Sequence, residues 1–262
     1  YYSPLMISDC AYAEELYDLV PLQVLQWINI LTSAGAIVLV CYPASHYLHR
    51  TIFEKVTKGL IISLYVFIVI FSVCLILVQG SQLAYRYTAR VKCDAQSPKV
   101  WCIFRYLVTV LTSSFALVHV GITVQHGLYS FLFSQRIQQL AARFSIIISA
   151  IIPVIFGVLA YHRDSLDGRI AYCSGFTEHG GEIVMSLLYF LLALDFFNTL
   201  VSFLLWKFNE RSLITDRQSF DLARTFHRRQ NLYAMQQFLP IATLHAIFYS
   251  VLFCILTFKI TK

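Results

Sequence analysis

The sequence holds few residues spaced for catalysis or for metal binding. His46 and His49 stand three residues apart, a spacing that puts two imidazoles one helical turn apart, where they could share a metal ion. No second cluster completes a ligand set, so both are interpreted as interfacial loop residues. The chain has no H-E-x-x-H motif, no G-x-S-x-G motif and no glycine-rich phosphate loop. We therefore expect no enzyme activity, no metal site and no cofactor.

Polar residues inside long apolar segments are the better candidates for function, because lipid makes such groups costly to bury. We expect ligand contacts from one set of these residues: Arg105, His119, Asp195, Asn198 and His245. Each has a simpler interpretation. Arg105 could extend its charge to the outer interface, and the others could hydrogen-bond a neighbouring helix.

The apolar segments that hold these residues are long enough to cross a bilayer. About 20 apolar residues are needed to span the hydrocarbon. Intervals with almost no charge predict six membrane-spanning helices, near residues 24–44, 60–82, 105–131, 144–161, 183–206 and 234–258. Their continuously apolar character favours helices over barrel strands, which alternate polar and apolar residues. The predicted fold is an all-α polytopic transmembrane bundle, in one domain over residues 1–262.

Composition supports the same fold class. The 262 residues are 58% hydrophobic and 13% charged, whereas soluble domains are about 25% charged. The net charge of +6 comes from Lys and Arg residues that lie between the apolar segments, so it does not indicate nucleic-acid binding. We therefore expect the protein to lie in a lipid bilayer.

Charge and cysteine placement both favour an N-terminus outside the cell. With this orientation the inner loops carry more Lys and Arg than the outer segments. Four cysteines then fall on the outer, oxidising side: Cys10, Cys93, Cys102 and Cys173. Four cysteines allow three pairings, and we favour Cys102–Cys173, with Cys10–Cys93 as the second bond.

Two stretches resemble a known receptor family. Cys102-Ile-Phe-Arg105 opens the third span, and Phe226-His-Arg-Arg-Gln-Asn231 precedes the sixth, followed by Leu239-Pro240. This layout resembles the nematode serpentine chemoreceptors of the alpha/beta (Sra-like) superfamily, which carry a Y-Q-x-x-E-N segment at that place. Where the family often has a Glu-Arg pair at the inner end of the third helix, this chain has Gln125-His126.

The resemblance implies a seven-helix G-protein-coupled receptor in the plasma membrane that binds an environmental chemical. Its partners would be a small-molecule ligand and a heterotrimeric G protein. Three arginines before the sixth span would contact that G protein: Arg224, Arg228 and Arg229. They could equally be the basic residues of a solvated inner loop.

Two questions stay open at this point. Six spans are visible, so a seven-helix receptor would lack its seventh span in this sequence. A small-solute transporter or channel subunit is the alternative function, although the chain shows neither the paired half-sequences of transporters nor a re-entrant filter segment.

Overall fold

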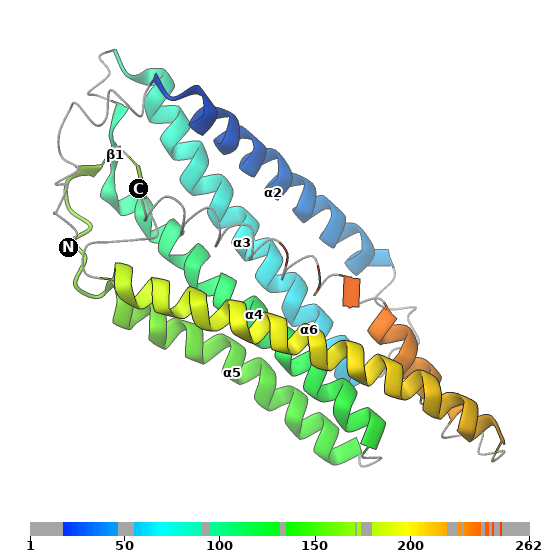
Figure 1. Ribbon diagram of the computed structural model, residues 1–262. Coiled ribbons are helices and arrows are strands. Elements are labelled where there is room, and N and C mark those ends of the chain that lie inside the picture. The colour runs from blue at the N-terminus through cyan, green and yellow to red at the C-terminus, as the bar shows by residue number, and fades with distance from the viewer. Residues whose placement is uncertain are drawn as a thin grey trace. The chain divides into compact units, whose positions relative to one another are not determined.

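A computed structural model describes residues 18–46, 55–90, 95–131, 135–170, 172–173, 180–218, 225–226, 228–236, 239–240, 243 and 247. The elements follow one another along the chain as α2 (Val20–His46), α3 (Lys55–Thr88), β1 (Ser97–Pro98), the 3-10 helix η2 (Lys99–Trp101), α4 (Cys102–Phe131), α5 (Gln135–Tyr161), β2 (Arg169–Ile170) and α6 (Gly181–Gln218). Figure 1 shows these helices, from blue α2 to yellow α6. The predicted all-α fold class is confirmed.

Within the described ranges, five helices are long and apolar enough to cross a membrane. Their candidate spans are Val20–Tyr42, Lys58–Thr88, Lys99–Phe131, Arg136–Tyr161 and Gly181–Ile214. They correspond to the first five predicted spans. The sixth, near 234–258, lies mostly outside the described residues.

Several helices are longer than the charge-free intervals predict. α5 begins at Gln135, so it includes Arg136 and Arg143 before its apolar part. α6 continues past Lys207 to Gln218. A charge ends the part of a helix that suits hydrocarbon, but backbone hydrogen bonds continue into water, so the intervals mark the membrane portion and not the helix ends.

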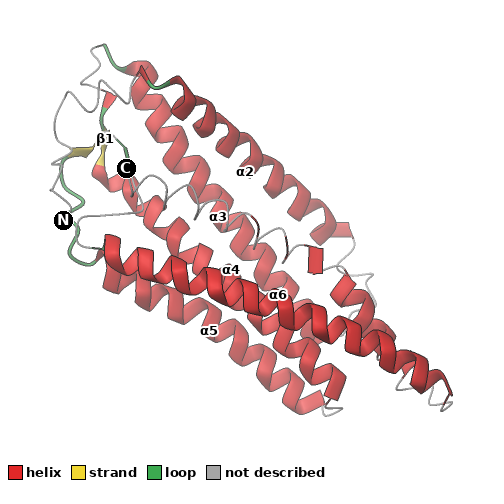
Figure 2. Cartoon of the chain, in the orientation of Figure 1, coloured by secondary structure: helices red, strands yellow, loops and turns green. Residues whose placement is uncertain are grey.

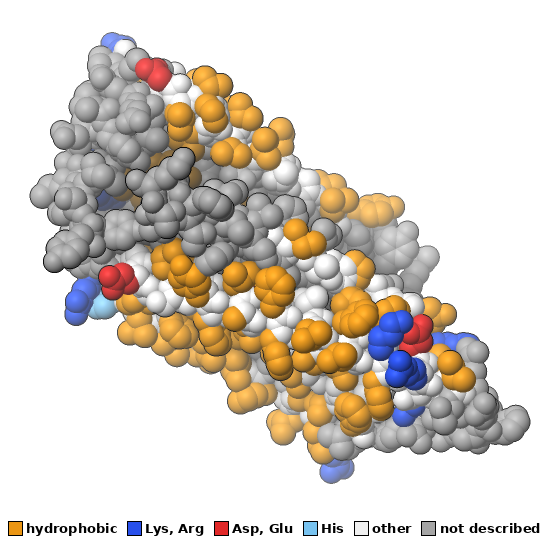
Figure 3. All heavy atoms as spheres, viewed as in Figure 1, with side chains coloured by type: hydrophobic (Ala, Val, Ile, Leu, Met, Phe, Trp, Pro, Cys, Tyr) orange, Lys and Arg blue, Asp and Glu red, His pale blue; other side chains and the backbone are white. Residues whose placement is uncertain are grey.

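Apolar side chains cover the outside of these helices. Leu39 on α2 and Leu140 on α5 are 73% and 71% exposed. Exposed phenylalanines and isoleucines also lie along α5 and α6. Figure 3 shows hydrophobic side chains along the helices and Lys and Arg side chains near helix ends. Soluble proteins rarely expose apolar surface on this scale, so lipid is the solvent that fits it.

Contacts group the residues into two compact units. The first comprises residues 1–49, 65–114 and 151–186, and the second comprises 50–64, 115–150 and 187–262. Helices α3 to α6 contribute residues to both. The expectation of a single domain over residues 1–262 remains a prediction.

In the first unit, the loop after α5 is attached to the segment at the start of α4 by backbone hydrogen bonds. β1 pairs with β2 in antiparallel register, Ser97 opposite Ile170, and the two short strands are drawn yellow in Figure 2. The Lys99 N–H donates to the Gly168 carbonyl at 3.0 Å. Gly168 has φ of +93°, a conformation that side chains disfavour, so glycine is needed at this turn.

A disulfide completes this attachment. Cys102, the first residue of α4, is bonded to Cys173, with 5.2 Å between their Cα atoms. Both cysteines are buried together with Val78 of α3. On the neighbouring turn, the Tyr106 and Tyr161 rings stack with centroids 4.0 Å apart. These contacts therefore hold the first turns of α4 in place within this unit.

In the second unit, α4 and α5 approach closely at a glycine. A Cβ atom added to Gly121 would lie 2.7 Å from the Ser145 Cβ, a distance that real Cβ atoms essentially never show. Small residues at such crossings let two membrane helices pack backbone to backbone.

We predict that Gly121→Ala destabilises the protein by about 1–3 kcal/mol, because the new methyl group forces α4 and α5 apart. Thermal unfolding of the purified protein in lipid nanodiscs measures the change. Gly59→Ala on α3 is the matched control, since a Cβ there meets nothing within 4 Å. Equal melting temperatures for the two variants would contradict this packing.

Candidate functional site

Ser130 is the centre of a buried polar network in the second unit. Its hydroxyl donates to the His126 carbonyl at 2.8 Å and accepts from the side-chain amides of Asn209 and Asn231, at 2.7 and 3.1 Å. One donor and two acceptor positions are all that a hydroxyl offers, so Ser130 is fully used. Ser130, Asn209 and Asn231 are each at most 5% exposed.

Asn231 makes the longest-range connection in this network. Its side-chain oxygen lies 2.6 Å from His126 Nδ1, and its amide nitrogen donates to the His126 carbonyl at 3.2 Å. Because a side-chain amide oxygen only accepts, the proton in this bond belongs to Nδ1. Helical residues 228–236, which carry Asn231, are thereby tied to α4 across 105 positions of sequence.

A second polar contact joins α4 to α6 one turn away. Thr123 and Ser202 hydroxyls are 2.8 Å apart, and Thr123 also donates to the His119 carbonyl at 3.1 Å. Since Thr123 has one proton, Ser202 is the donor between them. The Phe131 and Phe208 rings make a tilted contact beyond Ser130, with their centroids 5.0 Å apart. The facing sides of α4 and α6 in this unit are thus held by both polar and aromatic contacts.

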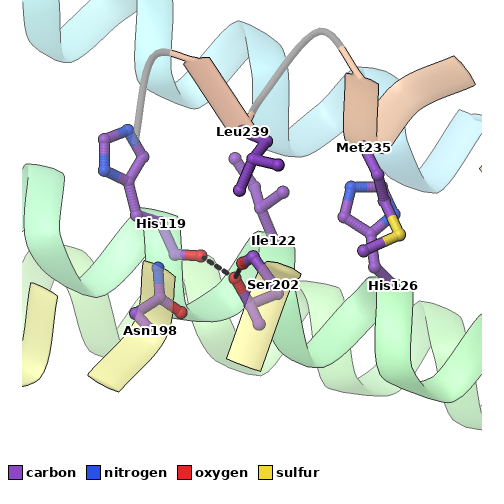
Figure 4. Close-up of a pocket in the computed structure, with 8 residues that line it drawn as sticks. His119, Ile122, His126, Asn198, Ser202, Met235 and Leu239 are labelled. Carbon is purple, nitrogen blue, oxygen red and sulfur yellow. Dashed lines mark hydrogen bonds between the residues drawn. The ribbon is translucent and has the colours of Figure 1, made fainter. Parts of the chain in front are cut away.

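A small cavity lies beside the network. It is lined by His119, Ile122, Thr123, His126, Asn198, Ser202, Met235 and Leu239. Figure 4 shows these side chains converging from α4, α6 and the residues after α6. Its volume is about 20 Å³. That is room for about one water molecule, whereas pockets for organic ligands begin near 300 Å³.

The structure brings two of the five expected ligand residues together. His119 and Asn198 line the same cavity. Asp195 is buried one turn earlier on α6 and is not among the lining residues. His245 lies outside the described residues.

Arg105 belongs to the first unit, in the first turn of α4. It is half-buried, and its Nε atom is buried without a hydrogen-bond partner among the described residues. Arg105 interacts electrostatically with Tyr161. Asp164, in the loop after α5, also interacts electrostatically with Tyr161. Arg105 and His119 belong to different units, so contact of both with one ligand stays a prediction.

Two of the three expected G-protein contacts are described, and they differ in exposure. Arg229 is exposed and Arg228 is buried, both on helical residues 228–236. Arg224 lies outside the described residues. Of the two described arginines, Arg229 is therefore the one whose side chain is accessible to a partner.

The residues that the sequence interpretation missed are the hydrogen-bonding partners themselves: His126, Ser130, Asn209 and Asn231. One signal was available. His119, Thr123, His126 and Ser130 recur every three or four residues, which puts them on one face of α4. Among the described residues, no group of three or more His, Cys, Asp or Glu is placed to hold a metal.

The disulfide in the structure is the pairing that the cysteine placement favoured. Cys10 and Cys93, proposed as the second pair, lie outside the described residues. Cys102 and Cys173 close a stretch of 71 residues, which in a chain-entropy account stabilises the folded state by at most about 4 kcal/mol.

We predict that Cys102→Ser and Cys173→Ser lower surface expression to the same extent, and that the double variant is no lower than either. Both single variants remove the same bond, so their effects cannot add. Antibody labelling of the tagged protein on intact cells measures this, with Cys41→Ser as the control for a free, exposed cysteine. Additive losses would contradict the pairing.

A comparison with protein families gives one match. The family model described as serpentine type 7TM GPCR chemoreceptor Sra matches residues 7–261, nearly the whole chain. No curated protein matches the chain. The family is one of receptors and not of enzymes.

Proposed function

We propose that this chain, which belongs to the serpentine Sra family of seven-transmembrane chemoreceptors, binds a small environmental chemical and signals to a G protein through a change in helix packing. The observation that carries the proposal is the buried network around Ser130. It links α4 and α6 to helical residues 228–236, which also carry Arg228 and Arg229.

The cavity beside the network connects the proposed ligand contacts to the hydrogen bonds of Asn231. His119 and Asn198 line it, and so does His126, whose ring nitrogen is bonded to Asn231. A ligand that enters between His119 and Asn198 must widen a space of about 20 Å³. It therefore favours a packing in which the walls have moved, and this differential affinity shifts the equilibrium between states.

We assign the ligand contacts to the polar residues named from the sequence: Arg105, His119, Asp195, Asn198 and His245. We assign the G-protein contacts to Arg224, Arg228 and Arg229. Breaking the Asn231 hydrogen bonds would release residues 228–236 from α4. The positions of the arginines would then change with the conformation of the cavity. Hydrogen bonds between membrane helices average about 0.6 kcal/mol each. The three bonds made by Asn231 thus amount to about 2 kcal/mol, enough to shift a two-state equilibrium about 30-fold.

We predict that Asn231→Ala raises ligand-free signalling, because it removes the three hydrogen bonds that the Asn231 side chain makes to α4. The expected rise in nucleotide exchange is about fivefold to 30-fold. The measurement is GTP-analogue binding to purified heterotrimers of each Gα class, mixed with the receptor in nanodiscs.

Ser149→Ala is the matched control, since Ser149 is equally buried but bonds only the Ile146 carbonyl of its own helix. Folding of each variant is checked by its melting temperature. A folded Asn231→Ala protein with unchanged exchange for every Gα class would contradict the proposed switch. Solute flux through reconstituted vesicles would instead support the transporter or channel alternative.

We further propose a plasma-membrane location with the N-terminus outside. The Cys102–Cys173 bond supports this orientation, because disulfides persist on the oxidising face. α4 begins at Cys102, so it would enter the membrane from the outer side. Counting back through α3 and α2 then puts the residues before Val20 outside as well.

We predict that a tag at the N-terminus is labelled on intact cells, because two spans separate it from the disulfide-bearing face. A second tag, inserted between Ser219 and Arg224, should be labelled only after permeabilisation. Fluorescent antibody binding before and after detergent treatment measures both. An N-terminal tag that needs permeabilisation would reverse the orientation.

A further inference from the structure

The first turns of α5 carry two arginines on one exposed face. Arg136 and Arg143 are both exposed and stand seven positions apart. Seven positions are close to two full helical turns, so the two side chains leave the helix in nearly the same direction, about 10 Å apart along its axis. The pair lies in the second unit and does not belong to the candidate site around Ser130.

The opposite face of α5 packs against the protein. Gln138, Ala142 and Ser149 are at most 4% exposed, and Ser145 lies against α4 at Gly121. The helical period of 3.6 residues puts these positions on the side away from the arginines. The arginine face is therefore the surface that this part of α5 turns to its surroundings.

Apolar side chains accompany the arginines on this face. Leu140, between the two arginines, is 71% exposed, and Ile147, one turn after Arg143, is 53% exposed. Both recur with the arginines every three or four residues, which puts all four on one side of the helix. Such a surface is complementary to a molecule with a charged head and an apolar tail.

The depth of the pair follows from the length of α5. About 20 residues cross the hydrocarbon, and counting back that many from Tyr161, the last residue of the helix, reaches Ala142. Arg143 thus lies at the edge of the hydrocarbon. Arg136 lies about 10 Å further out, at the level of the lipid headgroups and the adjoining water.

The charge of the pair is not balanced by described neighbours. The sequence contains no Asp or Glu between Asp94 and Asp164, a stretch that includes the whole of α4 and α5. Neither Arg136 nor Arg143 has a hydrogen bond or an ion pair with a residue that the structure describes. Two cations in this position are complementary to an anionic headgroup.

We propose that Arg136 and Arg143 bind the headgroup of an anionic phospholipid, whose glycerol and acyl chains lie against Leu140 and Ile147. The arginine guanidinium binds phosphate oxygens in pairs. The net negative charge distinguishes these lipids from phosphatidylcholine, whose choline cation would face the arginines. In the orientation proposed above, the start of α5 lies on the inner side, where anionic lipids are concentrated. The site does not rest on the proposed receptor function.

We predict that phosphatidylserine binds the full chain about 30-fold more tightly than phosphatidylcholine, because each basic residue at an anionic headgroup contributes about fivefold. Native mass spectrometry of the purified protein, titrated with each lipid in detergent, measures the dissociation constant of the first bound molecule. Arg136→Gln with Arg143→Gln should remove the preference. Arg136→Lys with Arg143→Lys keeps both charges and should retain most of it.

The matched control removes two cations from the end of α6, which lies on the same side of the membrane because α5 and α6 each cross it once. Lys207→Gln with Arg211→Gln changes the net charge equally, but Lys207 is already bound by Glu210 at 3.0 Å. The lipid preference should therefore persist. Melting temperatures check that each variant is folded.

Two results would overturn the proposal. Equal loss of preference in the α5 and α6 double variants would show a general attraction to basic surface and no site on α5. Equal binding of the two lipids by the unsubstituted chain would overturn it without any variant.

A last arm separates a lipid from a free anion. Glycerophosphoserine has the headgroup of phosphatidylserine without the acyl chains, so it cannot cover Leu140 and Ile147 and should not displace the lipid at equal concentration. Displacement at equal concentration would show that the arginines bind soluble anions, which overturns the assignment to a phospholipid.

Discussion

A polar group that is buried away from water must find its hydrogen-bond partner within the protein, and this constraint underlies both the fold and the candidate site. The backbone meets it by forming helices, in which each N–H and C=O finds a partner within the same segment. Side chains must meet it between helices. Ser130 does so completely, with one donated and two accepted bonds, and Asn231 uses both amide protons and its oxygen. Polar side chains therefore determine which helix faces meet.

Under the proposed function, the same constraint would make the network behave as a switch and not as a graded contact. Ser130, Asn209 and Asn231 are buried within the protein, so under the proposed function a broken bond would not be replaced at once by one to water, and intermediate positions of residues 228–236 would be costly. Two arrangements would then be favoured: the one with the network intact, and one in which the groups have found other partners. Bistable packing of this kind converts a small change at a ligand into a large movement.

Local composition was enough to predict the spans, whereas pairing between helices was not. Each of the first five spans follows from hydrophobicity within its own 20 to 30 residues, and that is why the intervals bounded by charges found them. The ends of α5 and α6 were missed because helix continuation through charged residues depends on backbone bonding. Cys102–Cys173 could be favoured because orientation restricts which cysteines share a face. The His126–Asn231 bond could not, because it joins residues 105 positions apart whose meeting depends on how the helices pack.

The size of the cavity has a consequence for how such a receptor would detect its ligand. A preformed pocket of several hundred Å³ could bind without any change in packing, and binding would then carry no signal. A space of about 20 Å³ that shares His126 with the network cannot be filled by an organic molecule unless its walls move. Detection and signalling would then be one event, and affinity would be reduced by the free energy of opening the network.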